Sequence, residues 1–518
     1  FKELCCSIRG CRVKIMKVVN SKEMFDLEKQ AIASGISERK MMKNAAKSIV
    51  EHLENSINLN KINGISILVG KGNNGSDAII VGALLSHKYN VKIFEILKRS
   101  EDISITLKRE KPKDSNIELY EFNTNMINTI KFNIQKDNLI IDGILGIGVN
   151  RKLDDNLSKI TSQINSLNSY ICSVDIPSGI NSDDGIIDKN SIRATETLML
   201  GYPKKGILNS SNFNFIGRIS TLDIGIKKNL SGRINLLNSE YIKKIEFYQK
   251  ENNHKYMNGK LVILAGSRNY IGANLFCNYS ALRSGVGLIA NILSKDLYPF
   301  LAGKINDVIY FDQDFQNELS IKDSLEIINS YDAVLLGPGL GNEEKQLDYY
   351  RKILTGGIKI PLILDADGIK LLNIENRKYF PDNIIITPHI GEMSLLSGIS
   401  KENILKDRLK CAIEISKKFH IYTVLKGPCT IISTPSGNAN FAPWVNSGLA
   451  KAGSGDILAG LIAGFVANKN LKNLLHSIEL GVFIHGFSGE LTRSQKGKIS
   501  MNATDILYNI PEAIKSFF

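Results

Sequence analysis

Short apolar runs recur along the chain, and each ends at a glycine or a polar residue before a stretch with helical spacing begins. Runs of this length, rich in isoleucine and valine, predict buried strands rather than helices. Alternation of such strands with helices predicts a parallel sheet covered by helices, which is an α/β fold. In the first half the runs occupy residues 65–69, 91–94, 139–142 and 171–175.

The second half repeats this pattern with a separate set of strands. A charge-rich stretch with little apolar periodicity, residues 227–258, separates the two sets and is the predicted domain boundary. Two α/β domains are therefore expected. The strands predicted in the second half occupy residues 261–265, 331–336, 361–364, 383–387 and 422–425.

Polar side chains follow the strands of the first half, at the ends where parallel sheets bind ligands. The first strand runs into a turn rich in glycine and asparagine, residues 70–77, whose geometry suits a bound phosphate. A single aspartate at a strand end is more often a turn-forming residue. Several at one edge favour a site, and Asn74, Asp142, Asp175 and Ser178 are all expected at the same edge.

A glycine-rich loop near the end of the chain, residues 446–456, precedes an apolar helix pattern. Gly448, Gly453 and Gly455 allow backbone N–H groups to converge on an anion at the positive end of that helix. Asp456 would then lie beside a bound phosphate, placed to take a proton from a hydroxyl group. The loop alone fits equally well an ordinary packed helix with Asp456 as its N-cap.

Composition narrows the class of protein. The 518 residues are 43% hydrophobic and 23% charged, as in a globular protein of two or three domains, and no apolar run is long enough to cross a bilayer. The net charge of +13 comes from scattered lysines without a basic stripe, which favours anionic small molecules over nucleic acid. The seven cysteines have no metal-binding spacing and suit the reducing cytoplasm.

Three motifs of the first half together resemble the YjeF N-terminal family, the NAD(P)H-hydrate epimerases. They are Gly-Asn-Asn-Gly at 72–75, Asp-Gly-x-x-Gly-x-Gly at 142–148 and Val-Asp-Ile-Pro-Ser-Gly at 174–179. The resemblance covers about residues 16–228 and implies a Rossmann-like, three-layer domain that binds a potassium ion. Lys204 stands where the family has a lysine.

The resemblance also implies the residues of the epimerase site. The potassium ligands would include Asn74, Asp142 and Ser178, and Asp175 would be catalytic at the reacting ring. The residues expected to bind the hydrate are Asn73, Asn74, Gly75, Ser76, Asp77, Gly146, Ile147, Gly148, Val149, Asn150, Arg151, Lys152 and Asp175.

Two positions depart from the family pattern, because Ser76 and Ala78 stand where the family has glycine. If residue 76 needs a positive φ, a side chain there strains the loop and weakens the site. If its φ is negative, the serine is tolerated. The first case would leave the domain as a scaffold or binding module without catalysis, and the second an active epimerase.

Motifs of the second half resemble the YjeF C-terminal family, the ADP- or ATP-dependent NAD(P)H-hydrate dehydratases of the ribokinase-like superfamily. They are Thr-Pro-His-x-Gly-Glu at 387–392, Gly-Ser-Gly-Asp at 453–456, His-Gly at 485–486 and Asn-Ala-Thr-Asp at 502–505. A lone His389 would usually be structural, but within this motif a site role is favoured.

The second resemblance implies an α/β/α domain with Asp456 as catalytic base and Mg²⁺ bound with ADP or ATP. The residues expected to contact the hydrate are Ala273, Gly339, His389 and Asp456. The residues expected to hold the nucleotide are Lys426, Gly427, Pro428, Cys429, Thr430 and Gly455.

Together the two resemblances imply a bifunctional nicotinamide-nucleotide repair enzyme of the cytoplasm, and they are compatible with a homo-oligomer. One domain would interconvert the R and S hydrates of NADH and NADPH, and the other would dehydrate the S form, with ADP as the typical nucleotide. The alternative for the second domain is a small-molecule kinase of the same superfamily. The expected boundaries are 1–15 for an extension outside the fold, 16–228 for the epimerase, 229–253 for a linker and 254–518 for the dehydratase.

Overall fold

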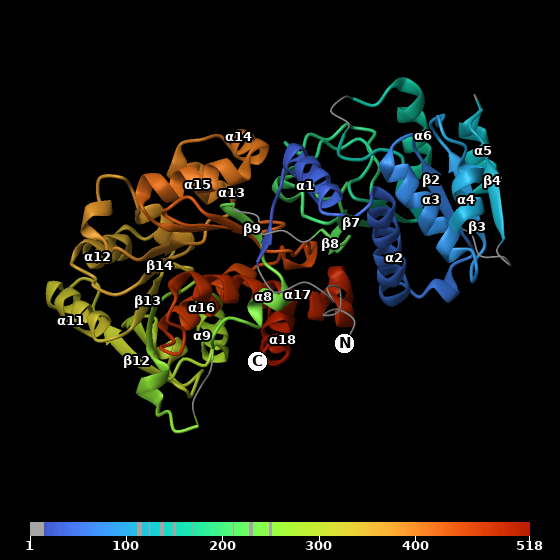
Figure 1. Ribbon diagram of the computed structural model, residues 1–518. Coiled ribbons are helices and arrows are strands. Elements are labelled where there is room, and N and C mark those ends of the chain that lie inside the picture. The colour runs from blue at the N-terminus through green and yellow to red at the C-terminus, as the bar shows by residue number, and fades with distance from the viewer. Residues whose placement is uncertain are drawn as a thin grey trace. The chain divides into compact units, whose positions relative to one another are not determined.

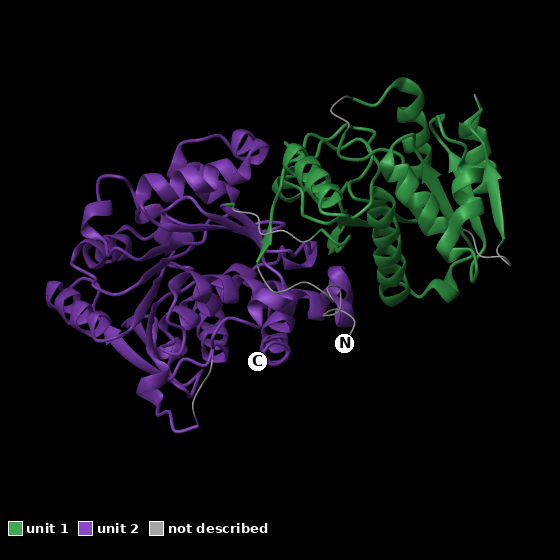
Figure 2. Cartoon of the chain, in the orientation of Figure 1, with its two compact units in different colours: residues 1–232 green, residues 233–518 purple. Residues whose placement is uncertain are grey.

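The computed structural model describes residues 15–110, 116–123, 125–134, 139–148, 152–167, 169–210, 212–226, 232–247 and 251–518. The chain forms two compact units, residues 1–232 and 233–518 (Figure 2). Most of the predicted extension and parts of the predicted linker lie outside the described residues. Within the described ranges, no helix has the length and apolarity needed to cross a membrane.

The first unit is built on a parallel sheet with strand order β4-β3-β2-β5-β6-β7-β8 (Figure 1). The chain fills one side of β2 and then crosses to the other side at β5, so the topological switch lies between these two strands. Ligands of such sheets bind at the carboxyl ends of the strands on either side of the switch. The strands are β2 (Ile65–Val69), β3 (Val91–Glu95), β4 (Ile117–Tyr120), β5 (Leu139–Gly143), β6 (Tyr170–Val174), β7 (Glu196–Leu200) and β8 (Arg218–Leu222).

Alternate residues of these strands fill two cores, one on each face of the sheet. Ile67 and Ile141 belong to the core covered by α1–α4, whereas Leu68 and Ile140 belong to the core covered by α5 and α6. The unit therefore has three layers, as expected. Its helices are α1 (Ser21–Ala33), α2 (Glu38–Ser56), α3 (Asn73–Leu85), α4 (Ile103–Glu110), α5 (Met126–Asn133), α6 (Asp155–Asn165) and α7 (Lys205–Asn209).

The sheet of the second unit has the strand order β9-β18-β17-β16-β15-β14-β13-β10-β11-β12. Neighbours from β16 through β12 pair in parallel, and β17 is antiparallel to both of its neighbours. The strands are β9 (Ile234–Leu236), β10 (Lys260–Leu264), β11 (Leu288–Ser294), β12 (Val308–Gln313), β13 (Ala333–Leu336), β14 (Leu362–Leu364), β15 (Ile384–Ile386), β16 (Tyr422–Leu425), β17 (Ile431–Ser433) and β18 (Ala439–Phe441).

Helices cover both faces of this second sheet, with α12 and α15 on one side and α9 and α16 on the other (Figure 1). This is the expected α/β/α arrangement, in which α16 packs against both α9 and α17. The helices are α8 (Ser239–Ile242), α9 (Ile271–Arg283), α10 (Tyr298–Leu301), α11 (Glu318–Asn329), α12 (Glu344–Thr355), α13 (Ile390–Ser397), α14 (Lys401–Lys406), α15 (Arg408–Phe419), α16 (Ser454–Ala467), α17 (Leu474–Ser500) and α18 (Ala503–Lys515).

A buried carboxyl group on α17 accepts hydrogen bonds from α8 and from β18, within the second unit. Glu479 is fully buried, and its Oε2 accepts a hydrogen bond of 2.7 Å from the Tyr241 hydroxyl. Its Oε1 accepts a hydrogen bond from Asn440 Nδ2. Both donors are neutral, so burial outweighs the two hydrogen bonds and raises the pKa of Glu479 to about 7.

Glu479→Gln should remove a pH dependence from the stability of the second unit. The folded pKa lies above the ordinary value of 4.5, so the wild-type unit loses stability as the pH rises from that value through about 7. The loss is about 3 kcal/mol above this window. Urea unfolding of both proteins at pH 5 and pH 8, followed by the fluorescence of Trp444, measures it. Equal pH dependence in the two proteins would contradict the assignment.

Candidate active sites

Three residues expected to bind a cation meet at the carboxyl ends of β5 and β6. Asp142 is fully buried, and its carboxylate accepts hydrogen bonds from Ser178 Oγ at 2.6 Å and Ser178 N at 2.9 Å. Ser178 Oγ also accepts a hydrogen bond from Leu145 N at 3.0 Å, and Asn74 Nδ2 donates to Leu145 O at 2.8 Å. Burial raises the pKa of Asp142, although the hydrogen bonds from Ser178 and Ser173 act to lower it. The structure therefore brings Asn74, Asp142 and Ser178 together.

Asp175 is held beside this cluster by a buried lysine. It follows β6 with a φ of 64°, a left-handed conformation that costs energy in a residue other than glycine and often marks a functional position. Its Oδ1 accepts hydrogen bonds from Leu200 N at 2.9 Å and from the Lys204 ammonium group. Lys204 is fully buried and also donates to Leu200 O at 2.7 Å. The pairing fixes the position of the Asp175 carboxylate.

The turn at residues 70–77 leads directly into α3, which begins at Asn73. Ser76 lies in the first turn of this helix and is not among the residues with positive φ. Its backbone is therefore unstrained, and its hydroxyl accepts a hydrogen bond of 2.7 Å from Arg99 Nη2. Ala78 is also in α3 and is fully buried in the core. Neither departure from the family's glycines distorts the loop.

Carboxyl groups from three elements surround the start of α3. Glu38 Oε1 accepts a hydrogen bond of 2.9 Å from Asn73 Nδ2. Asp77 is buried, and burial together with the charges of Asp175, Glu28 and Glu38 raises its pKa well above the ordinary value. Burial likewise raises the pKa of Glu28. Glu28 and Glu38 were not predicted from the sequence, because they lie on α1 and α2 outside any motif.

The other residues expected to bind the hydrate follow β5. Gly146 packs against the Asn74 side chain, Ile147 is half-buried, and Gly148 and Lys152 are exposed. The expected contacts of Val149, Asn150 and Arg151 lie outside the described residues.

Lys426 is the centre of the candidate site in the second unit. It follows β16, and its Nζ lies 2.8 Å from Asp365 Oδ1 and 3.8 Å from Glu392 Oε2. Asp365 follows β14 and also accepts a hydrogen bond of 2.6 Å from Thr387 Oγ1, after β15. Burial disfavours the charge on Lys426, but the Asp365 and Glu392 carboxylates outweigh it and raise the pKa of Lys426. The ends of three adjacent strands thus build one charged cluster.

Asp456 lies in the first turn of α16, next to this cluster. Gly453, with a φ of 88°, is the N-cap, so the alternative in which Asp456 caps the helix is wrong. No side chain caps the helix, and Lys426 Nζ would lie 3.5 Å from a Cβ placed on Gly455. Burial and the charge of Asp365 raise the pKa of Asp456 to about 6, although Lys426 opposes the shift. A carboxylate, an ammonium group and a helix N-terminus therefore converge.

One ring nitrogen of His389 caps a helix, and the side chain is largely exposed. His389 is the N-cap of α13, and its Nδ1 accepts hydrogen bonds from Gly391 N at 2.9 Å and Glu392 N at 3.2 Å. An accepting Nδ1 places the ring proton on Nε2. Nε2 lies 3.4 Å from Glu392 Oε1, and the side chain is 60% exposed, so a ligand can approach the ring from solvent. The structural role that the sequence analysis weighed against a site role is present, because His389 caps α13.

The remaining expected residues of this unit fall into two groups. Gly339 and Ala273 are adjacent, because a Cβ on Gly339 would come within 2.8 Å of the Ala273 Cβ. In the segment 426–430, Cys429 has a φ of 47°, and its carbonyl accepts a hydrogen bond of 3.4 Å from the buried Arg408. Arg408 was not found from the sequence, since it begins α15 rather than a motif.

His485, which lies on α17, contacts the glycine-rich loop. Its Nε2 lies 3.2 Å from Ser454 Oγ, and burial lowers the pKa of His485 to about 4. The imidazole is therefore neutral at physiological pH and holds the loop beside Asp456.

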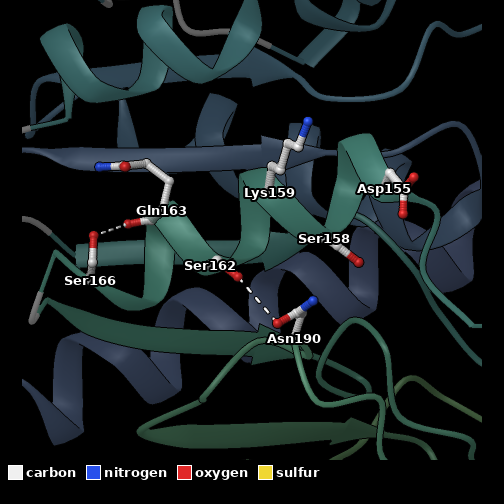
Figure 3. A pocket seen from close by; sticks show the side chains of 7 residues that line it. All are labelled: Asp155, Ser158, Lys159, Ser162, Gln163, Ser166 and Asn190. Carbon is white, nitrogen blue, oxygen red and sulfur yellow. Dashed lines mark hydrogen bonds between the residues drawn. The ribbon is translucent and has the colours of Figure 1, made fainter.

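A surface pocket on α6 is lined by none of the candidate site residues described above (Figure 3). It has a volume of about 480 Å³, and Ser162 Oγ lies 3.4 Å from Asn190 Oδ1 at its base. None of its lining residues was expected in a site. The residues are Asp155, Ser158, Lys159, Ser162, Gln163, Ser166 and Asn190.

Comparisons with known proteins match both units. Residues 261–512 match the model of the NAD(P)H-hydrate dehydratase family, and residues 38–206 match that of the YjeF-related protein N-terminus. The bifunctional NAD(P)H-hydrate repair enzyme Nnr of Dictyoglomus turgidum is 31% identical over 96% of this chain and 98% of its own length. The Nnr of Thermofilum pendens is 29% identical over 97% of both chains.

Among solved structures, the ADP/ATP-dependent NAD(P)H-hydrate dehydratase from Bacillus subtilis is 26% identical. It covers 55% of this chain and 98% of its own, with a TM-score of 0.49.

Two α/β units, each with titratable side chains gathered at the carboxyl ends of its parallel strands, define a two-domain enzyme. The chain belongs to the family of bifunctional NAD(P)H-hydrate repair enzymes.

Proposed function

We propose that this chain repairs hydrated NADH and NADPH. The first unit interconverts the R and S hydrates, and the second dehydrates the S hydrate with ADP or ATP. The observation that carries the dehydratase assignment is Asp456, with its pKa of about 6, beside Lys426 at the uncapped start of α16. Family membership supports both activities.

Dehydration requires that the hydroxyl group of the hydrate become a better leaving group. The Asp456 carboxylate removes the hydroxyl proton, and the oxygen attacks the terminal phosphoryl group of ADP, releasing AMP. Lys426 and the amides at the start of α16 stabilise the charge on the transferring phosphoryl group. The ring then loses a proton and phosphate together, which restores the double bond.

The nucleotide is held by the segment 426–430 and Gly455, and the hydrate by Ala273, Gly339 and the His389 Nε2–H group. Mg²⁺ would enter with the nucleotide and neutralise charge on its phosphates.

The rate of dehydration should depend on pH with an acidic limb near pH 6. A general base works only when deprotonated, and burial places the pKa of Asp456 at about 6. Activity should therefore fall about tenfold for each pH unit well below that value and be flat above it, up to the next ionisation. The kcat/KM for the S hydrate, measured from about two pH units below this pKa to about two units above it, checks this prediction. A flat profile across pH 6 would contradict the role of Asp456.

For the first unit, the chemistry of the donors supports a potassium site. Asp142, Ser178 and Asn74 offer carboxylate, hydroxyl and amide oxygens, the ligands that hard cations prefer. A potassium ion there would offset the buried charge of Asp142. Asp175, fixed by Lys204, exchanges a proton with the reacting ring of the hydrate. The unstrained Ser76 supports an active epimerase rather than a scaffold.

The test is spectroscopic. Purified protein is given a mixture of the R and S hydrates of NADH with ADP or ATP, and the dihydronicotinamide absorbance is followed. We expect its recovery with ADP at a rate at least equal to that with ATP. Activity with ATP and none with ADP would reject the nucleotide assignment, and no recovery with either would reject the dehydratase.

A further inference from the structure

Arg99 forms a set of hydrogen bonds at the start of α3 to which the proposed function assigns no role. It follows β3, and its Nη1 donates to Gly70 O and, at 3.2 Å, to Gly72 O. Its Nη2 donates to Ser76 Oγ at 2.7 Å. One guanidinium group thus joins the turn before the helix to the first turn of the helix itself.

The backbone of Arg99 is fixed as well. Its N–H group donates to Glu95 Oε1 at 2.8 Å, and Glu95 Oε2 accepts a hydrogen bond of 3.0 Å from Phe122 N. Gly75 provides the space for the guanidinium, because a Cβ there would approach Arg99 Nη1 to 2.8 Å. The arginine is therefore held from the side of β3 and β4.

The bonded carbonyls determine where the neighbouring amides point. In a trans peptide the C=O and the following N–H are antiparallel. Because Gly70 O and Gly72 O face Arg99, the N–H groups of Lys71 and Asn73 face away from it. No side chain caps α3, so these donors and the helix N-terminus are available to bind an anion.

Arg99 places a cation near a helix N-terminus, where the helix dipole repels it. The carboxylates of Glu95 and Glu101 offset part of this repulsion, and a bound anion would offset it further. The hydrate carries a diphosphate, which supplies such an anion.

We propose that Arg99 and Ser76 form a brace that positions the backbone amides of residues 71–75 for the diphosphate of the hydrate, whereas the amides of Gly70 and Ser76 donate to Gly143 O and Gly72 O. The inference rests on the proposed epimerase function. Ser76, which replaces a family glycine, is the acceptor that fixes the second arm of the guanidinium. Arg99 is thus a positioning residue, and the two side chains act as a pair.

The first test is kinetic. Arg99→Ala should raise the KM of epimerisation about tenfold with kcat within about threefold, because charged hydrogen bonds that orient a binding loop are lost. Arg99→Lys keeps the positive charge but lacks the planar guanidinium that donates to several acceptors at once, so its KM should lie between those of wild type and Arg99→Ala. Arg109→Ala, which removes an exposed arginine from α4, is the matched control and should behave as wild type.

The pairing is tested by a double-mutant cycle. Ser76→Ala should raise KM in the wild-type background and have little further effect in Arg99→Ala. Additive effects would overturn the pairing. Dehydration of pure S hydrate by the same proteins should be unchanged, which controls for the second unit. Circular dichroism and thermal unfolding control for the folding of the first unit.

Hydrogen exchange tests whether the brace exists, and it does not depend on enzyme activity. The Ser76 amide, which donates to Gly72 O at 3.2 Å, should exchange about tenfold faster in Arg99→Ala than in wild type, with the rest of the unit unchanged. Unchanged exchange and unchanged KM would overturn the inference while the epimerase stands. A wild-type protein without epimerase activity would instead reject the proposed function, and the exchange comparison would still establish or reject the brace.

Discussion

Asp456→Asn should lower the rate of nucleotide-dependent dehydration by about 10²–10⁴-fold, the usual cost of losing a positioned base. Asparagine has nearly the same shape but cannot accept the hydroxyl proton. Folding should be preserved, because the substitution removes a charge that burial already disfavours and leaves no cavity. The rate of NADH recovery from S hydrate and ADP measures the loss.

Nucleotide binding separates catalysis from site integrity in this variant. Lys426, the segment 427–430 and the amides of α16 remain, so isothermal titration should still detect ADP. Asp323→Asn, on the exposed face of α11, is a matched control that should keep full activity. Turnover near wild type in Asp456→Asn would show that another group removes the proton.

Many buried strands of both sheets could be predicted from the sequence, because a strand covered on both faces is a continuous apolar run. Residues 65–69 are an example, predicted as a strand and found as β2. The buried β7 and the largely buried β11 were missed, and so were strands at the edges. β12 alternates between half-buried and exposed residues, and β4 is similarly exposed, so neither forms an apolar run. Edge strands depend on their neighbours in the sheet more than on local composition.

The candidate sites were predictable where a functional residue directly follows a buried strand. Asp175 and Lys426 are such residues, and Asp142 lies at the carboxyl end of β5; in each unit parallel pairing places these positions at the carboxyl ends of its own strands.

Their partners were not predictable in the same way. The hydrogen bond from Lys204 to Asp175 joins residues 29 positions apart, and that from Lys426 to Asp365 spans 61 positions. Arg99 reaches Ser76 only because β3 lies beside β2. Such contacts follow from tertiary packing, which no local pattern contains.

Asp175→Asn should reduce epimerisation to the spontaneous rate, an expected loss of at least about 10²-fold. Asparagine adopts the left-handed conformation of residue 175 more readily than most residues, so the backbone can be retained. What is lost is the proton acceptor and the negative charge beside Lys204. The measurement supplies only R hydrate, which the second unit does not dehydrate, together with excess ADP and the active second unit. NADH then appears only as fast as R converts to S.

Removing Asp175 leaves the buried Lys204 ammonium without its carboxylate, which can cost about 3–5 kcal/mol of stability. A double variant, Asp175→Asn with Lys204→Met, removes both charges and keeps the test valid if the single variant unfolds. Circular dichroism confirms the fold of each, and Asp155→Asn on exposed α6 is the matched control. Wild type should consume R hydrate faster than it epimerises spontaneously, and both Asp175 variants should not. Equal rates in wild type and the folded variants would mean that the first unit does not catalyse epimerisation, and a scaffold role would take its place.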